Sequence, residues 1–379
     1  METKLLNGNN KEAIAEASKI LQDGGLVAFP TETVYGLGAD ALNADAAAKI
    51  YAAKGRPSDN PLIVHIADTD AVEKLADLET MNRAHPDMVK KAHMLMEAFW
   101  PGPLTIIFPK LAIVPDGTTG GLPTVAIRMP SHPIAQELIR TSGVSIAAPS
   151  ANTSGRPSPT TAQHVWEDMD GRIEMILDGG AVGIGIESTI VDMTGTIPTI
   201  LRPGFITKAM LSEIIGDVTI DPAIIEPDPN LRPKAPGMKY THYAPHGTLS
   251  IVEAAADESA NRASLHSGVK VSYNATEAET LRVAEKIKAL VNEKEAQGYK
   301  VAILTTKEHA SLYKNYLHVL IVGEGNKGQT ISARLYAALR ECDSEQMEYM
   351  YSEAFDQNEL GGAIMNRLLK AAGHRVITV

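Results

Sequence analysis

Cysteine is nearly absent from this sequence, since Cys342 is the single one among 379 residues. One cysteine excludes an internal disulfide and any zinc site built from cysteine ligands, and it fits a reducing compartment. Long apolar runs are missing as well, because no stretch approaches the roughly 20 apolar residues of a membrane span. The first ten residues contain no apolar signal core. We therefore expect a cytoplasmic protein that does not enter a membrane.

Positive charge is in deficit, because 35 Lys and Arg stand against 46 Asp and Glu, a formal net charge of −11. An acidic chain has little bulk affinity for nucleic acid or anionic membranes, so any basic site, including one with weak RNA contact, must be local. Apolar residues, by contrast, are plentiful. They make up 44% of the chain, enough for sizeable cores, and the length suggests two or three domains.

Several familiar catalytic motifs are missing too. The chain has no G-x-x-x-x-G-K-[ST] loop, which excludes a Walker-type ATPase. Residues 143–147 miss the nucleophile elbow at its last position, and no Ser/His/Asp set stands out. Residues 323–328 match G-x-G-x-x-G after an expected strand. No acid stands convincingly at the end of a following strand, which argues against dinucleotide binding there.

The order of the expected elements indicates an α/β protein in two parts. Strands and helices alternate through residues 1–216, which predicts an open twisted sheet of mixed strand directions with helices. Residues 217–247 contain six prolines and predict an extended, semi-rigid linker. The pattern restarts at 248–379 as a smaller Rossmann-like α/β domain, parallel and doubly wound.

Hydrophobic periodicity sets the bounds of these elements. In the first part, the expected helices include 11–22, with Asn10 as its cap, and about 85–98, which precedes a proline-rich corner. In the second part, the expected helices are 280–294, 330–342 and 362–372, and the expected strands are 249–252, 269–273, 301–305 and 318–322.

A short basic stretch at 53–62 is the feature around which the first part is organised. It reads Ala-Lys-Gly-Arg-Pro-Ser-Asp-Asn-Pro-Leu, so Lys54 and Arg56 stand two residues apart on a bent segment. Arg as a planar fork and Lys as a point charge suit a phosphate. A second polar loop at 149–158 supplies hydroxyls, an amide and backbone N–H groups for an anion or a sugar. The alternative for 53–62 is an ordinary helix end with basic residues at the dipole and a proline stop.

Three further features can border such a site. The hydroxyl-rich turn at 31–38 follows a strand, where α/β proteins place ligands, although an ordinary tight turn has the same composition. His65, near a strand end, is either a ligand or a core histidine. Arg128 closes an apolar strand, where it is either solvated or clamps a carboxylate. Cations and hydroxyls without a nucleophile favour phosphoryl or nucleotidyl transfer, which works by positioning and charge stabilisation.

Six short motifs then point to a family. They are Phe-Pro-Thr-Glu-Thr-Val-Tyr-Gly-Leu at 29–37, Lys-Gly-Arg at 54–56, Pro-Gly-Pro-Leu-Thr at 101–105, Ser-Ala-Asn at 150–152, Arg-Pro-Gly at 202–204 and His-Tyr-Ala-Pro at 242–245. In this order they resemble the Sua5/YrdC family, whose members are threonylcarbamoyl-AMP synthases. The resemblance implies a YrdC-like catalytic domain at 1–216, a linker at 217–247 that closes over the active site, and a Sua5 C-terminal domain at 248–379.

The resemblance also implies a reaction and its residues. L-Threonine, bicarbonate and ATP, which carries Mg²⁺, give threonylcarbamoyl-adenylate, pyrophosphate and water. The product then passes to a downstream tRNA threonylcarbamoyl transferase complex that modifies an adenosine beside the anticodon. The implied ATP residues, with Lys54 and Arg56 as catalytic cations and Tyr243 as a lid, are Lys54, Arg56, Asn60, Thr124, Ser150, Asn152, Ser158, Arg202 and Tyr243. The implied threonine residues, with Arg128 on the carboxylate, are Thr33, His65, Arg128, Ala148 and Ser188.

Three alternatives lead to other functions. Hydrogenase-maturation carbamoyltransferases share the YrdC fold, but they resemble this chain over one domain and carry cysteine-rich zinc fingers, which one cysteine cannot form. An RNA-binding module would use the basic site as a groove and would show steep salt dependence. A regulatory nucleotide-binding protein would use the second domain as an effector site.

Overall fold

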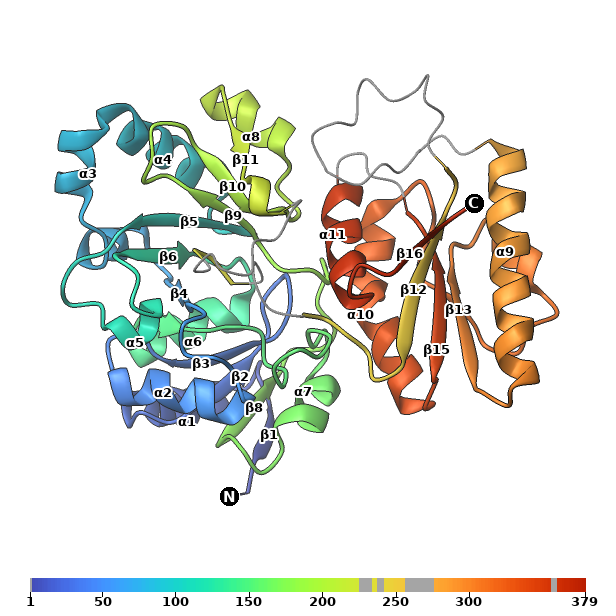
Figure 1. The fold of residues 1–379 in the computed structure, drawn as a ribbon. Helices are drawn as coiled ribbons and strands as arrows, with labels where there is room; N and C mark the ends of the chain where they lie inside the picture. The colour runs from blue at the N-terminus through green and yellow to red at the C-terminus, as the bar shows by residue number, and fades with distance from the viewer. Residues whose placement is uncertain (1, 225–233, 237–241, 256–275, 356–359) are drawn as a thin grey trace. The chain divides into compact units, whose positions relative to one another are not determined.

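The computed structural model describes residues 2–224, 234–236, 242–255, 276–355 and 360–379. They form two compact units (Figure 1). The first unit comprises Met1–Ser154 and Ser158–Lys239, and the second comprises Gly155–Pro157 and Tyr240–Val379. Among the described residues, no helix has the length and apolar character needed to cross a bilayer.

The described part of the first unit is built on one sheet with the strand order β1-β8-β2-β3-β7-β4-β6-β5-β9-β10-β11. β4 and β6 pair in parallel, whereas β2 and β3 pair antiparallel, which confirms the predicted mixed sheet. The strands are β1 Lys4–Asn7, β2 Val27–Phe29, β3 Gly36–Asp40, β4 Ile63–His65, β5 Leu104–Pro109, β6 Thr124–Arg128, β7 Ile146–Ala147, β8 Met175–Asp178, β9 Thr189–Asp192, β10 Thr199–Arg202 and β11 Thr219–Ile220.

Helices cover this sheet, and alternation along its strands buries both faces. On β2, Val27 and Phe29 belong to a cluster with residues of α1 and α6, whereas Ala28 belongs to the cluster on the other face, with residues of α2 and α4. The helices are α1 Lys11–Gln22, α2 Ala44–Lys54, α3 Leu78–Ala84, α4 Pro86–Phe99, α5 Asp116–Thr119, α6 Pro133–Ser142, α7 Ala162–Met169 and α8 Lys208–Ile215, with 3₁₀ turns η1 Thr69–Lys74 and η2 Pro222–Ile224.

Local sequence explains where the helix before the site starts and stops. The Asn43 side chain accepts hydrogen bonds from the N–H groups of Asp45 and Ala46, at 3.0 and 3.1 Å, and so caps the start of α2. Gly55 ends α2 in the left-handed region, with φ 62°. This glycine turns the chain between Lys54 and Arg56, and the two cations have different partners: Lys54 donates to the 149–158 loop, and Arg56 donates to carbonyls of residues 60 and 61.

The second unit contains a five-stranded sheet of order β14-β13-β15-β12-β16 in its described part, and every pair in it is parallel. In Figure 1, α9 lies on one face of the sheet, with α10 and α11 on the other. This confirms the predicted parallel, doubly wound domain. Its elements are β12 Thr248–Glu253, α9 Glu277–Ala296, β13 Val301–Thr305, η3 Ala310–Tyr313, β14 Val319–Ile321, α10 Gly328–Ser344, β15 Tyr349–Glu353, α11 Gly361–Ala371 and β16 Val376–Thr378.

A few elements differ from the expectations. The structure places α3 before the expected helix at 85–98, and it adds β15 and β16, which periodicity did not predict. β11 lies in the stretch expected as linker, yet it pairs with β10 in the first sheet. The expected strand at 269–273 lies outside the described residues.

Candidate active site

Two neighbouring parallel strands end on polar side chains. β4 ends at His65 and β6 ends at Arg128, and the two residues are register partners. β7 runs antiparallel beside β4 and leads into the 149–158 loop, with the Ala148 N–H donating to the Ile63 carbonyl at 2.9 Å. His65, Arg128 and Ala148, expected together around threonine, therefore lie close to one another in the sheet.

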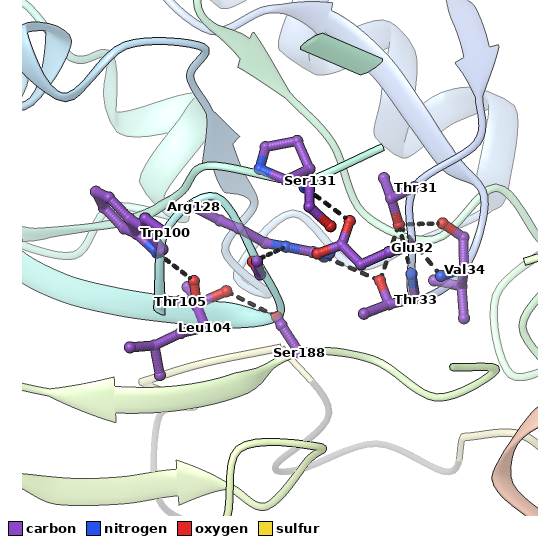
Figure 2. Close-up of polar contacts among 12 residues, drawn as sticks. Thr31, Glu32, Thr33, Val34, Trp100, Leu104, Thr105, Arg128, Ser131 and Ser188 are labelled. Atoms are coloured by element: carbon purple, nitrogen blue, oxygen red, sulfur yellow. Dashed lines mark hydrogen bonds and ion pairs between the residues drawn. The ribbon is translucent and has the colours of Figure 1, made fainter. Parts of the chain in front are cut away.

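Arg128 is the centre of a buried polar cluster (Figure 2). Its residue is 4% exposed. Its Nη2 donates to Glu32 Oε1 at 2.6 Å, its Nη1 to Thr33 Oγ1 at 3.0 Å, and its Nε to the Gly102 carbonyl at 3.4 Å. Thr33 Oγ1 is also hydrogen-bonded to Thr31 Oγ1 at 2.8 Å, which fixes the turn against the guanidinium. A guanidinium fixed in this way is a directed partner for a carboxylate.

His65, the register partner of Arg128 on the neighbouring strand, is a neutral imidazole at neutral pH. Its Nδ1 is hydrogen-bonded to the Ile63 carbonyl at 3.1 Å. Burial, followed by the positive charge of Arg128, lowers the pKa of His65 to about 3. The ring therefore adds no charge to the cluster at neutral pH.

A hydroxyl pair connects this cluster to a second arginine. Thr105 Oγ1 and Ser188 Oγ are hydrogen-bonded at 2.7 Å. Arg202 donates from Nη2 to Ser188 Oγ at 3.1 Å and from Nε to the Ser188 carbonyl at 3.0 Å. Ser188, expected at threonine, and Arg202, expected at ATP, are therefore in direct contact.

Lys54 ties the end of α2 to the 149–158 loop. Its residue is only 3% exposed, and its Nζ donates to the carbonyl oxygens of Ser150 and Asn152. The Ser150 hydroxyl donates to Asn152 Oδ1, and the Ser154 N–H donates to the Lys54 carbonyl at 2.8 Å. The structure thus brings together three of the expected ATP residues, with a buried ammonium among them.

The remaining ATP candidates have other partners in the structure. Arg56 donates from Nη2 to the Pro61 carbonyl at 3.1 Å and from Nε to the Asn60 carbonyl at 3.3 Å. Ser158 donates to Glu187 Oε1 at 2.6 Å. Thr124 begins β6, at the opposite end of that strand from Arg128.

Tyr243 belongs to the second unit. Its ring is stacked on Tyr336 with centroids 5.1 Å apart, and the guanidinium of Arg367 lies 5.9 Å from its centroid. Its approach to a nucleotide stays a prediction.

Sequence reasoning missed two acidic partners of the site. Glu32 pairs with Arg128, and Glu187 accepts from Ser158. The available signal was an acid between two threonines in a polar turn, and an acid directly before Ser188. In the described ranges, no three His, Cys, Asp or Glu side chains are grouped in a way that could hold a metal ion.

Comparisons with known proteins agree with this architecture. Residues 19–204 match the family model Sua5_yciO_yrdC, described as "Telomere recombination", and residues 206–373 match the model described as "Threonylcarbamoyl-AMP synthase, C-terminal domain". The threonylcarbamoyl-AMP synthase of Bacillus subtilis is 47% identical, over 97% of this chain and 95% of the relative. The enzyme of that name from Pyrococcus abyssi is 42% identical, over 98% of both chains.

A solved structure is similar along the whole length. The crystal structure of P. abyssi Sua5 complexed with L-threonine superposes with a TM-score of 0.84 at 40% identity, covering 100% of both chains. Because both the sequence relatives and this structure span nearly the entire polypeptide, the chain belongs to the Sua5/YrdC family, in the Sua5 branch that carries the C-terminal domain.

Proposed function

We propose that this protein is a threonylcarbamoyl-AMP synthase, a nucleotidyltransferase that converts L-threonine, bicarbonate and ATP into threonylcarbamoyl-adenylate, pyrophosphate and water. The observation that carries the proposal is that the first unit holds two buried cationic side chains, Lys54 and Arg128, each among polar groups. Lys54 is held against the Ser150–Asn152 loop, and Arg128 is held at the neighbouring strand ends. Full-length relatives of that name support it.

The chemistry asks for charge and position rather than for a protein nucleophile. The deprotonated threonine nitrogen attacks the carbon of bicarbonate, a C–O bond breaks with loss of water, and a carbamate forms. A carbamate oxygen then attacks the α-phosphorus of ATP, and pyrophosphate leaves. Lys54, Arg56 and Arg202 would neutralise the phosphates, and Arg128 would bind the threonine carboxylate. Thr33, His65, Ala148 and Ser188 would fix the amino acid, while Asn60, Thr124, Ser150, Asn152, Ser158 and Tyr243 would fix the nucleotide.

Contacts between the candidate threonine residues and the candidate ATP residues support placing the two substrates side by side. Ser188 accepts from Arg202 and is hydrogen-bonded to Thr105, which lies on β5 beside Arg128 on β6. A substrate held at Arg128 and a phosphate held at Arg202 would therefore be neighbours. Proximity of that kind can replace several kcal/mol of barrier, on the order of 7–11 kcal/mol in well-oriented systems.

The metal ion, the cellular compartment and the downstream partner are part of the same proposal. Mg²⁺ would enter with ATP, bound to its phosphates. The unstable product would pass in the cytoplasm to a tRNA threonylcarbamoyl transferase complex.

Pyrophosphate release by the purified protein tests the proposal. With ATP and magnesium present, L-threonine and bicarbonate are omitted in turn, and release is expected only when both are supplied. Release that ignores bicarbonate would indicate a different adenylation, and absence of release under all conditions would refute the synthase.

A further inference from the structure

Glu32 occupies an unusual position between Arg128 and the backbone. Its Oε1 accepts from Arg128 Nη2 at 2.6 Å, and its Oε2 accepts from the Ser131 N–H at 3.1 Å (Figure 2). The Arg128 side chain is 5% exposed and the Glu32 side chain 14%, so both charges are largely removed from water. A nearly buried ion pair is costly to build unless its geometry is good, which makes it a feature to explain.

Around Arg128, Glu32 supplies the anionic group. The other described side chains of the cluster shown in Figure 2 are hydroxyls, an indole and apolar groups, and the depressed pKa of His65 keeps that ring neutral. The cluster therefore presents one cation and one anion side by side. A free amino acid at neutral pH carries the same two charges, a carboxylate and an ammonium.

We propose that Glu32 binds the ammonium group of the amino-acid substrate, so that the Arg128–Glu32 pair recognises both charges of the zwitterion. The inference rests on the proposed function, because it deepens the assignment of Arg128 to the substrate carboxylate. Glu32 is then a specificity-determining residue that touches substrate.

The hydrogen-bond inventory allows this arrangement. A guanidinium has five N–H bonds, and three of those on Arg128 are directed to Glu32, Thr33 and Gly102, which leaves two for an incoming carboxylate. A carboxylate has about four lone-pair sites, and Glu32 uses one for Arg128 and one for Ser131. Substrate can thus bind alongside the ion pair without breaking it.

The strength of this contact changes during the reaction, because the charge of the substrate nitrogen changes. The substrate nitrogen is charged before carbamoylation and neutral afterwards, when it retains one N–H. Glu32 therefore attracts the free amino acid more strongly than the carbamoylated product, because only the ammonium adds a Coulombic attraction between opposite charges to the hydrogen bond.

Binding of two ligands to the full-length protein tests the inference by calorimetry. They are L-threonine and 2,3-dihydroxybutanoate, in which a hydroxyl replaces the ammonium. The wild type should bind threonine at least tenfold more tightly than dihydroxybutanoate. In Glu32→Gln that ratio should fall to about twofold or less, while Glu73→Gln, an exposed acid on η1, should keep the wild-type ratio.

Each result decides between the possibilities. A Glu32→Gln protein that retains the full preference for the ammonium would overturn the assignment, and so would a wild type that binds dihydroxybutanoate as tightly as threonine. The second readout needs no variant, so it decides even if Glu32→Gln does not fold. Glu32→Asp, which keeps the charge on a shorter side chain, should retain part of the preference. If the wild type binds dihydroxybutanoate and threonine but releases no pyrophosphate, the proposed function fails separately.

Discussion

Lys54 is a charged side chain that the protein buries almost completely, against two carbonyl oxygens of the 149–158 loop. We expect Lys54→Ala and Arg56→Ala each to reduce pyrophosphate release by about a hundredfold or more, the usual cost of removing one charge-stabilising group from an active site. Lys74→Ala, an exposed lysine on η1, is the matched control. Native circular dichroism with retained turnover in both site variants would contradict the phosphate assignment.

His65 gives the molecule a measurable pH dependence. Burial, with the nearby charge of Arg128, lowers the His65 pKa from 6.5 to about 3 in the folded protein. Between these pH values the unfolded chain binds a proton that the native ring does not, so stability falls as pH falls. His65 alone changes the free energy of unfolding by up to about 1.4 kcal/mol per pH unit in this range. The stability that depends on its neutral ring is fully present above the pKa of the unfolded chain.

Urea unfolding of the wild type and His65→Gln at pH 4, 5, 6 and 7 measures this effect. The variant should lose less stability between pH 6 and pH 4 than the wild type, although it is less stable at pH 7. His93→Gln, at an exposed position on α4, should follow the wild-type slope. Identical slopes for wild type and His65→Gln would show that His65 does not titrate as described.

At the residue scale, the sequence singled out those candidates whose side-chain chemistry suggests a role without knowledge of a partner, and their roles stay predictions. A lysine and an arginine on either side of a glycine, or an arginine at the end of a strand, suggest an anion-binding role even when no partner residue is known. Glu32 and Glu187 were missed because their meaning lies in partners 96 and 29 positions away along the chain. An acid in a turn has no distinctive role until the fold places a cation beside it.

At the scale of elements, Gly55 separates the end of α2 from Arg56. Its φ of 62° is left-handed, and a Cβ added there would meet no atom within 4 Å. Gly55→Ala should therefore lower stability by about 1–2 kcal/mol through backbone strain alone. Gly55→Asn should cost less, because Asn tolerates this conformation better than Ala.

Urea titration followed by tryptophan fluorescence checks this expectation. Gly183→Ala is the control, because a Cβ there also meets nothing within 4 Å and its φ lies outside the left-handed region. Equal stabilities of the two Ala variants would mean that the left-handed turn is not maintained in solution.

Elements with a strong local signal were predicted with bounds close to those observed. α1 carries a capping Asn10 and a regular apolar face, and it runs over Lys11–Gln22 as expected. β15 was missed, although it lies between β12 and β13. Its sequence, Tyr-Met-Tyr-Ser-Glu, combines two strand-favouring tyrosines with Met, Ser and Glu and has no β-branched residue, so the local signal is mixed and burial in the sheet decides its conformation.

At the scale of the whole molecule, the order of the strands in the sheet could not be predicted from the sequence. In the first sheet, β1 pairs with β8 and β5 with β9, across long stretches of chain. Such pairings depend on the packing of both faces at once, since every short apolar strand is compatible with several neighbours. The class of fold could be predicted from alternation, whereas the register that brings His65 beside Arg128 could not.

The two units also carry separate natural probes. Both tryptophans, Trp100 and Trp166, lie in the first unit, and the single cysteine, Cys342, lies on α10 of the second. Cys342 is 1% exposed. Burial, with the negative charges of Asp343, Glu341 and Glu345, raises the pKa of its thiol to about 12. Since the thiolate is the reactive form, the native protein should resist alkylation.

We expect denaturant to unfold the units in two distinguishable transitions, because each has its own hydrophobic cluster. Pulsed alkylation of Cys342 reports the second unit, and tryptophan fluorescence reports the first. The midpoints should differ, and saturating ATP, which is proposed to bind chiefly to residues of the first unit, should raise the fluorescence midpoint more than the alkylation midpoint. Cys342→Ser, which cannot be labelled, controls for reaction at other side chains. Coincident midpoints that move together with ATP would instead show that the chain unfolds as one cooperative body, so that nucleotide binding stabilises the second unit as much as the first.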